Sequence, residues 1–107
     1  MGRTVFSLVL TTVKNKTSAR RMAEKLVSEK LAACVSAIPN VTSVYRWRGK
    51  VERAKEVMLV VKTSEKKLDR LIHCIKELHS YEIPEILVLR VERGLPEYLK
   101  WLEESLS

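Results

Sequence analysis

The hydrophobic positions of this chain alternate between a strand-like and a helical spacing. Residues 4–13 form a run of β-branched and large apolar residues, which is typical of a buried central strand. In residues 18–33 the apolar positions recur three and four residues apart, and this spacing predicts an amphipathic helix with a charged outer face. Asn15, Thr17 and Ser18 offer side-chain oxygens that can cap the start of that helix.

The middle of the chain predicts a long β-hairpin. A second apolar strand over residues 34–38 is interrupted at residues 39–40, a proline and an asparagine. Residues 41–48 and 50–63 then form two extended runs that meet at Gly49. The second run is far longer than the usual strand of about five or six residues. One small monomer cannot cover both faces and both edges of such a hairpin, so the pattern favours a homo-oligomer.

The last third of the chain predicts a helix, a strand and a short helix. The first of these helices is expected after residues 63–64, a threonine and a serine that can cap it, and it should end near residues 79–80. Pro84 blocks helix formation, and the apolar run 86–91 predicts the last strand. Pro96 suits the first turn of the terminal helix. Three side chains of this helix are expected to face inward: Tyr98, Trp101 and Leu102.

The resulting order of elements is β-α-β-β-α-β with a terminal helix. Two right-handed split β-α-β units in this order predict an α+β ferredoxin-like sandwich, in which an antiparallel four-stranded sheet carries both helices on one face. At 107 residues the chain is long enough for one core and too short for two, so we expect a single domain over residues 1–107. The fold alone does not specify a function.

Composition narrows the class of protein. Hydrophobic residues make up 46% of the chain and charged residues 31%, which is typical of a soluble globular protein. The longest apolar run, residues 57–61, is too short to cross a bilayer, so no membrane partner is expected. No signal-peptide pattern precedes the first strand, and Cys34 and Cys74 make no disulfide framework. We therefore expect a cytoplasmic protein with two free thiols.

The charge is basic and unevenly distributed. The net charge is +7, and residues 1–55 carry twelve basic and three acidic side chains, against eight and ten in residues 56–107. Such asymmetry is typical of a surface that binds an anion or a nucleic acid, although a solvated exterior is the commoner cause. An RNA-recognition domain would place aromatic residues around a strand glycine in a set pattern, and residues 48–52 lack all of them. Nucleic acid is therefore not the expected partner.

The residues that could bind a metal are few and badly spaced for chelation. On the second helix Cys74 and His73 lie five and six residues before His79, and neither spacing puts two donors on one helical face. A metal site would have to join separate elements or subunits, for example Cys34 with His79. A role as a small core residue is the simpler alternative for each thiol.

Catalytic motifs are missing as well. The chain has no GxSxG, HExxH, P-loop or GxGxxG pattern, and this predicts a protein that is not an enzyme. Tyr81, Glu82 and Glu85 surround Pro84 just before the last strand, and their polar groups could converge on a pocket. Anchoring a turn or an interface is the alternative role for the same residues.

Four segments of the chain together resemble the CutA family of divalent-ion tolerance proteins. The first is LAACV at residues 31–35 with Pro39 behind it, and the second is SVYRWRGKVE at residues 43–52. The third is HSYEIPEI at residues 79–86, and the fourth is YLKW at residues 98–101. The resemblance covers almost the whole chain. Its positions on the hairpin are Tyr45, Trp47, Gly49, Lys50, Glu52, Glu56 and Lys62.

The resemblance implies a tight homotrimer in which the long hairpin strands pair between subunits. It also implies a role in tolerance of divalent ions, copper especially, and no enzymatic activity. Some bacterial members carry a copper-linked cysteine late in the first strand, where this chain has Thr11. The motif positions best suited to a metal or ligand pocket between subunits are Cys34, His79, Tyr81 and Glu85. We expect copper(II) to bind there through His79 with help from Glu85 or a neighbouring carboxylate.

Two other functions stay open at this point. The chain could be a trimeric small-ligand or signalling module like the nitrogen-regulatory PII proteins, with its basic half binding a small anion. It could also be a single-domain nucleic-acid binder. Salt-dependent binding to an oligonucleotide would support the second of these, whereas saturable titrations with copper and with an anion would separate metal binding from anion binding.

Overall fold

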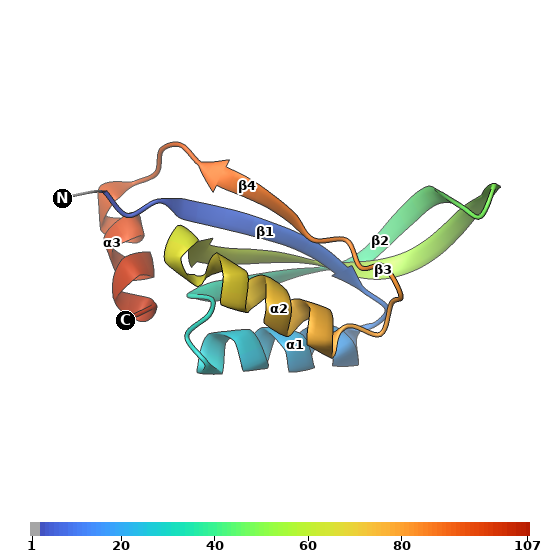
Figure 1. Ribbon diagram of the computed structural model, residues 1–107, viewed down its shortest axis with the longest axis horizontal. Helices are drawn as coiled ribbons and strands as arrows, with labels where there is room; N and C mark the ends of the chain where they lie inside the picture. Colours follow the sequence, from blue (N-terminus) through green and yellow to red (C-terminus); the bar gives the residue numbers. More distant parts are fainter. Residues whose placement is uncertain (1–2) are drawn as a thin grey trace.

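A curved sheet covered on one side by helices makes up residues 3–107, which are the residues that the computed structural model describes (Figure 1). The elements follow the order that the hydrophobic pattern predicts. Their bounds are β1 Phe6–Val13, α1 Lys16–Ser28, β2 Cys34–Trp47, β3 Lys50–Ser64, the 3₁₀ turn η1 Glu65–Lys67, α2 Leu68–Leu78, β4 Leu87–Val91 and α3 Pro96–Ser105.

The sheet is antiparallel throughout, and its strands stand in the order β2-β3-β1-β4. This order, with α1 and α2 on the same face of the sheet, confirms the ferredoxin-like sandwich (Figure 1). The core lies between that face and the two helices. Its fully buried apolar side chains come from β1, β3 and both helices: Val9, Leu59, Val61, Leu26, Leu71 and Ile75.

α1 ends at Ser28, well before the end at residue 33 that the apolar spacing predicts. Lys30 has a positive φ of 58°, and the amide of Leu31 donates to the carbonyl of Leu26 at 3.0 Å, so the chain turns back there. Leu31 and Ala32 continue the helical spacing because they fill the same core from the loop, with 2% and 1% of their surface exposed.

The two predicted helix caps have different outcomes. Asn15 caps α1, because its side chain accepts a hydrogen bond of 2.8 Å from the amide of Ser18. The cap predicted at residues 63–64 is wrong. The hydroxyl of Thr63 instead donates to the carbonyl of Leu31 at 2.6 Å inside the core, and Ser64 makes no side-chain cap bond. α2 therefore begins through the 3₁₀ turn η1.

β2 runs unbroken from Cys34 to Trp47, where the sequence predicts two strands. The interruption at residues 39–40 is a β-bulge, since the pairing with β3 shifts between Ile38 and Val41. Asn40 takes a φ of 60°, which asparagine tolerates better than most residues. Beyond the bulge the two arms of the hairpin project past the helices (Figure 1).

The face of the sheet opposite α1 and α2 has no layer of helices over most of its length within residues 3–107 (Figure 1), and α3 packs against Phe6 and Val91 at one end. Apolar side chains on this uncovered face are therefore accessible: Ile38 on β2 and Leu87 and Leu89 on β4 have between 45% and 56% of their surface exposed. In the same part of the chain no helix combines the length and the apolar character needed to cross a membrane.

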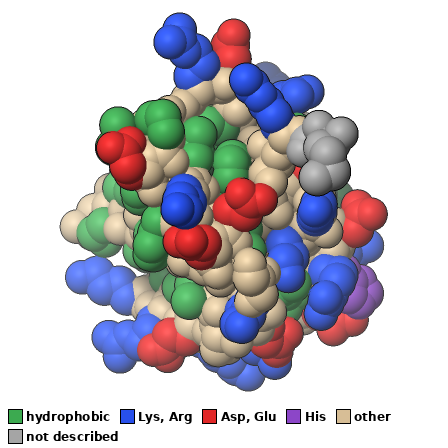
Figure 2. Space-filling view, turned by 90° about the vertical axis from the view of Figure 1, so that its left-hand side faces the viewer, with side chains coloured by type: hydrophobic (Ala, Val, Ile, Leu, Met, Phe, Trp, Pro, Cys, Tyr) green, Lys and Arg blue, Asp and Glu red, His purple; other side chains and the backbone are tan. Residues whose placement is uncertain are grey.

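α3 lies at the end of the molecule that carries both termini (Figure 1). Of its three residues predicted to face inward, only Leu102 is buried, and the prediction is wrong for Tyr98 and Trp101. Their rings stack on each other with centroids 5.6 Å apart and are 41% and 45% exposed. Figure 2 views this end of the molecule, where hydrophobic side chains are exposed among charged ones.

Candidate functional site

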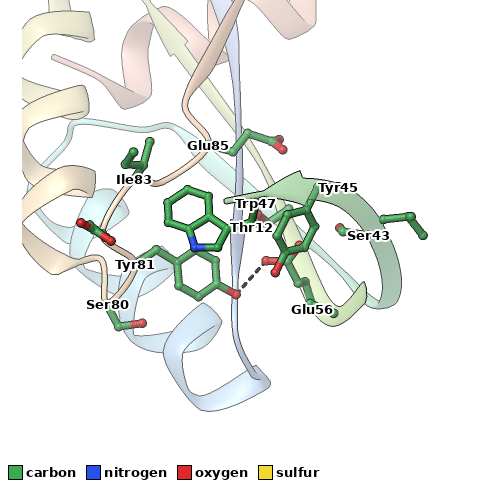
Figure 3. Close-up of a pocket in the computed structure, with 12 residues that line it drawn as sticks. Thr12, Ser43, Tyr45, Trp47, Glu56, Ser80, Tyr81, Ile83 and Glu85 are labelled. Carbon is green, nitrogen blue, oxygen red and sulfur yellow. Dashed lines mark hydrogen bonds between the residues drawn. The ribbon is translucent and has the colours of Figure 1, made fainter. Parts of the chain in front are cut away.

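A cleft of about 770 Å³ opens between the hairpin and the segment that joins α2 to β4 (Figure 3). The two arms of the hairpin form one wall, and residues 80–85 form the other. It lies on the uncovered side of the sheet, beside the end of β1. Its main side chains are Tyr45, Trp47, Glu56, Tyr81, Glu82 and Glu85.

Glu56 and Tyr81 join the two walls. The hydroxyl of Tyr81 donates a hydrogen bond of 2.7 Å to Oε2 of Glu56 (Figure 3). Only 8% of the surface of Glu56 is exposed. Burial raises the pKa of the Tyr81 phenol, and the hydrogen bond to Glu56 raises it further. The phenol therefore stays protonated at neutral pH and serves as a donor to the carboxylate.

His79 fastens residues 80–85 to the end of β1. Its Nε2 lies 2.7 Å from the carbonyl oxygen of Thr12, and its Nδ1 accepts a hydrogen bond of 3.3 Å from the amide of Tyr81. A carbonyl can only accept and an amide N–H can only donate, so the imidazole is the neutral tautomer with its proton on Nε2. β4 pairs with β1 only as far as Leu10, and His79 bonds the β1 backbone just beyond that point. Both ring nitrogens are thus used within the protomer.

Aromatic residues of β2 form the hairpin wall. Tyr45 and Trp47 alternate with outward residues and both line the cleft (Figure 3). At the tip, Arg48 and Gly49 have φ values of 51° and 81°, the pattern of a two-residue type I′ turn. The guanidinium of Arg48 lies 5.5 Å from the centroid of the Trp47 ring and 3.4 Å from the carboxylate of Glu82, in an ion pair that is exposed on both sides. That pair links the tip to the other wall.

The remaining hairpin positions lie on the exposed arm of β3. Lys50 pairs with Trp47, and Glu52 pairs with Tyr45, across the two strands. Both side chains are exposed. Glu85 is also exposed, and it lines the cleft from the opposite wall.

Cys34 does not reach the cleft. It lies at the start of β2, where the ammonium of Lys62 is 3.7 Å from its sulfur. Lys62 pairs with Leu8 of β1, whereas His79 bonds Thr12, which is four residues along the same strand. Four residues of a strand span roughly 13 Å, so Cys34 and His79 do not share a site within the protomer.

The candidate metal ligands are scattered over residues 3–107. Within residues 3–107 no three His, Cys, Asp or Glu side chains are grouped so that they could hold a metal ion. Glu56, Glu82 and Glu85 line one cleft without forming such a group. Thr11 is fully buried, and its hydroxyl oxygen lies 3.4 Å from Nε2 of His79. The described residues of one chain therefore provide no ready set of three such ligands.

Sequence reasoning missed part of the cleft. Thr12 lines it from the end of β1, which the pattern treats only as a buried strand. Ser43 and Ile83 line it from the two walls. One signal for Thr12 was present, because two threonines interrupt the apolar run of residues 4–13 near its end.

A family model described as CutA1 divalent ion tolerance protein matches residues 7–105. The chain belongs to the CutA1 family. The match runs from β1 into α3 and includes both walls of the cleft.

Similar proteins carry the same family name. The divalent-cation tolerance protein CutA of Thermus thermophilus is 45% identical over 98 residues, which are 92% of this chain and 95% of that protein. A rice protein, Protein CutA 1, chloroplastic, from Oryza sativa, is also 45% identical over 98 residues, but this chain spans 55% of its length. The chain likewise spans 64% of a CutA homolog from Xenopus laevis, which is 44% identical over 96 residues.

The solved structure of CutA from Xylella fastidiosa has the same fold. It is similar to this chain with a TM-score of 0.93 and 37% sequence identity, over 95% of this chain and 98% of that one. The ferredoxin-like sandwich with a projecting hairpin is therefore shared with a solved CutA1-family structure.

Proposed function

We propose that this CutA1-family chain works as a homotrimer in the cytoplasm, in tolerance of or response to divalent metal ions such as copper, and that the metal is held where subunits meet. The uncovered apolar face of the sheet is the observation that carries the proposal. The free thiols Cys34 and Cys74 support a reducing compartment.

The uncovered face favours assembly. Ile38, Leu87 and Leu89 expose about half of their surface on it, and soluble monomers rarely leave a contiguous apolar surface of this kind in water. The two edges of the sheet, β2 and β4, are also unpaired within residues 3–107, and unpaired edges favour pairing with another chain. The resemblance to CutA proteins supports three copies.

Copper binding, as proposed, requires the assembled trimer. A copper(II) ion prefers imidazole and takes several donors, but His79 has both ring nitrogens in hydrogen bonds, so the ion would have to displace one of them. Glu85 is an acidic donor that stays exposed at the cleft, and Cys34 is half-buried on another part of the sheet. Donors from two subunits would complete the site.

A substitution on the uncovered face tests both parts of this proposal. Leu89→Lys puts a charge at a position that is 45% exposed, and Val27→Lys, at a position 42% exposed on α1, is the matched control. We expect sedimentation to give a trimer for the wild type and Val27→Lys, and smaller species for Leu89→Lys. Copper(II) should bind the two trimers and bind Leu89→Lys at least tenfold more weakly. A wild-type monomer, or equal copper binding by all three proteins, would contradict the proposal.

A second candidate function, a small-anion module, has one observation in its favour. A pocket of about 140 Å³ beside the start of α1 is lined by Lys14, Ser18 and Arg21. These residues belong to the basic half of the chain. The positive charges of Lys14 and Arg21 would attract a small anion into this pocket. Titration with inorganic phosphate tests it, because binding by the wild type that is lost in Arg21→Gln would favour this function.

A further inference from the structure

The charge of the cleft is opposite to the charge of the chain. The net charge is +7, yet the side chains that line the cleft include three glutamates and no lysine or arginine, and Arg48 at the hairpin tip pairs with only one of the three, Glu82. An anion would be repelled by these carboxylates, whereas a cation would be attracted. The basic half of the chain therefore does not predict the ligand of this cleft.

Glu56 is the carboxylate that most requires a cation. It is 8% exposed, and its hydrogen bond within residues 3–107 comes from Tyr81, a neutral donor. None of the ion pairs found within residues 3–107 includes Glu56, and the one at the cleft joins Glu82 to Arg48. No buried side-chain oxygen among the described residues lacks a partner, so the other oxygen of Glu56, Oε1, is accessible to solvent, and Glu56 lines the cleft. A buried carboxylate without a counter-charge is costly, and a cation in the cleft would offset that cost.

Aromatic and aliphatic side chains surround this carboxylate. The rings of Tyr45, Trp47 and Tyr81 line the cleft, and Val44 and Ile83 add aliphatic surface (Figure 3). Aromatic faces attract organic cations through their quadrupole, but they cannot coordinate a metal ion. A volume of about 770 Å³ lies within the range of small-molecule sites.

We propose that this cleft binds a small organic ammonium ion, whose N–H groups face the carboxylate of Glu56 and whose hydrocarbon part lies against Tyr45, Trp47 and Tyr81. An ammonium ion supplies the hydrogen-bond donors that Oε1 of Glu56 needs and the positive charge that the cleft favours. Its main charged partner is Glu56, whereas the copper proposal uses His79 and Glu85, and the amine is tested on protein freed of metal.

Three ligands with the same six-carbon chain and different charges test the proposal. The probe is n-hexylammonium, with 1-hexanol as the neutral analogue and hexanoate as the anionic one, each titrated into EDTA-treated wild-type protein. The indole N–H resonance of Trp47 reports occupancy by NMR. We expect hexylammonium to saturate this shift, hexanol to bind at least tenfold more weakly, and hexanoate to leave it unmoved.

Two matched substitutions then locate the charge. Glu56→Gln keeps the shape of the side chain, and it should weaken hexylammonium binding about tenfold or more, the usual loss for a charge-assisted hydrogen bond. Glu77→Gln is the control at an exposed contact with His73 on α2, outside the cleft, and it should change binding less than about threefold. Trp47→Ala removes a ring of the cleft. At a protomer concentration where sedimentation shows it assembled like the wild type, it should still weaken binding of the amine, read there from the ring resonances of Tyr81, even if Glu56→Gln does not fold.

Several results would overturn the proposal. They are equal binding of hexanol and hexylammonium, binding unchanged by both Glu56→Gln and Trp47→Ala, or no binding of the amine at all. The last result would mean that another subunit fills the cleft or pairs with Glu56. A loss of copper binding in the separate titration would leave the amine result standing.

Discussion

Replacing His79 by alanine should loosen the wall of the cleft and destabilise the fold by about 2 kcal/mol. The substitution removes the 2.7 Å hydrogen bond to the Thr12 carbonyl and the 3.3 Å bond from the Tyr81 amide. Each net hydrogen bond contributes roughly 0.5–1.5 kcal/mol, and the shorter one should lie in the upper part of that range. The tilted contact between the His79 and Tyr81 rings, with centroids 4.8 Å apart, adds a smaller contribution.

Two milder substitutions separate these contributions. The side-chain nitrogen of His79→Gln can reach the position of Nε2 and keep the bond to Thr12, whereas the side-chain oxygen of His79→Asn can replace Nδ1 and keep the bond to Tyr81. We expect the loss of unfolding free energy to increase from His79→Gln through His79→Asn to His79→Ala. Urea unfolding at one fixed protomer concentration measures it, because the stability of an oligomer depends on concentration. Equal losses for all three variants, or a loss below about 0.5 kcal/mol for His79→Ala, would refute this account of the ring.

Three further predictions concern the core, the assembly and a thiol. Leu71→Ala should lower the unfolding free energy by about 2–5 kcal/mol, because Leu71 is fully buried under the sheet; a loss below 1 kcal/mol in urea unfolding would contradict that packing. Trp47→Ala should weaken self-association more than Trp101→Ala, since Trp47 lies on the hairpin at the uncovered face, and equal sedimentation of the two variants would count against it. Burial, and then the nearby Glu29 carboxylate, raise the pKa of the Cys74 thiol, so iodoacetamide should alkylate Cys74 at pH 8 several times more slowly in the folded protein than in urea, with the difference shrinking as the pH rises. Equal rates in both states would show that the thiol is not shielded.

The topology could be predicted because each helix and strand buries one face. That burial appears in the sequence as a regular spacing of apolar residues. The boundaries were harder, since a loop residue can fill the core as well as a helical one. Leu31 continues the period of α1 although the chain has already left the helix. The bulge at residues 39–40 similarly looks like a strand end, because proline and asparagine interrupt the pattern whether or not the strand resumes.

The site was predicted where its residues are neighbours in sequence and missed where they meet through the fold. Tyr81, Glu82 and Glu85 lie on one segment, and their convergence on a pocket was a hypothesis from sequence that the cleft supports. The contact between Tyr81 and Glu56 joins residues 25 positions apart, and it depends on the path of the loop after α2. The exposure of Tyr98 and Trp101 was not predictable from the spacing of apolar residues alone. An apolar helix face predicts that the face is buried, but it does not say whether residues of the same chain pack against it.

The proposed assembly and the proposed cation binding should be linked, because both would involve the uncovered face of the sheet. Glu56 precedes the stretch of β3 whose outer side chains, Met58 and Val60, lie on that face and are only partly buried in the protomer. A neighbouring subunit there would exclude water, lower the local dielectric and strengthen the attraction between Glu56 and a cation. A ligand that binds the trimer more tightly than the monomer stabilises the trimer by mass action. Saturating hexylammonium should therefore lower the protomer concentration at which the wild type dissociates in sedimentation equilibrium. Glu56→Gln should assemble at least as well without the amine and should not respond to it, since it has no buried charge to compensate. An equal response from the two proteins, or none from the wild type, would show that the cleft and the interface act separately.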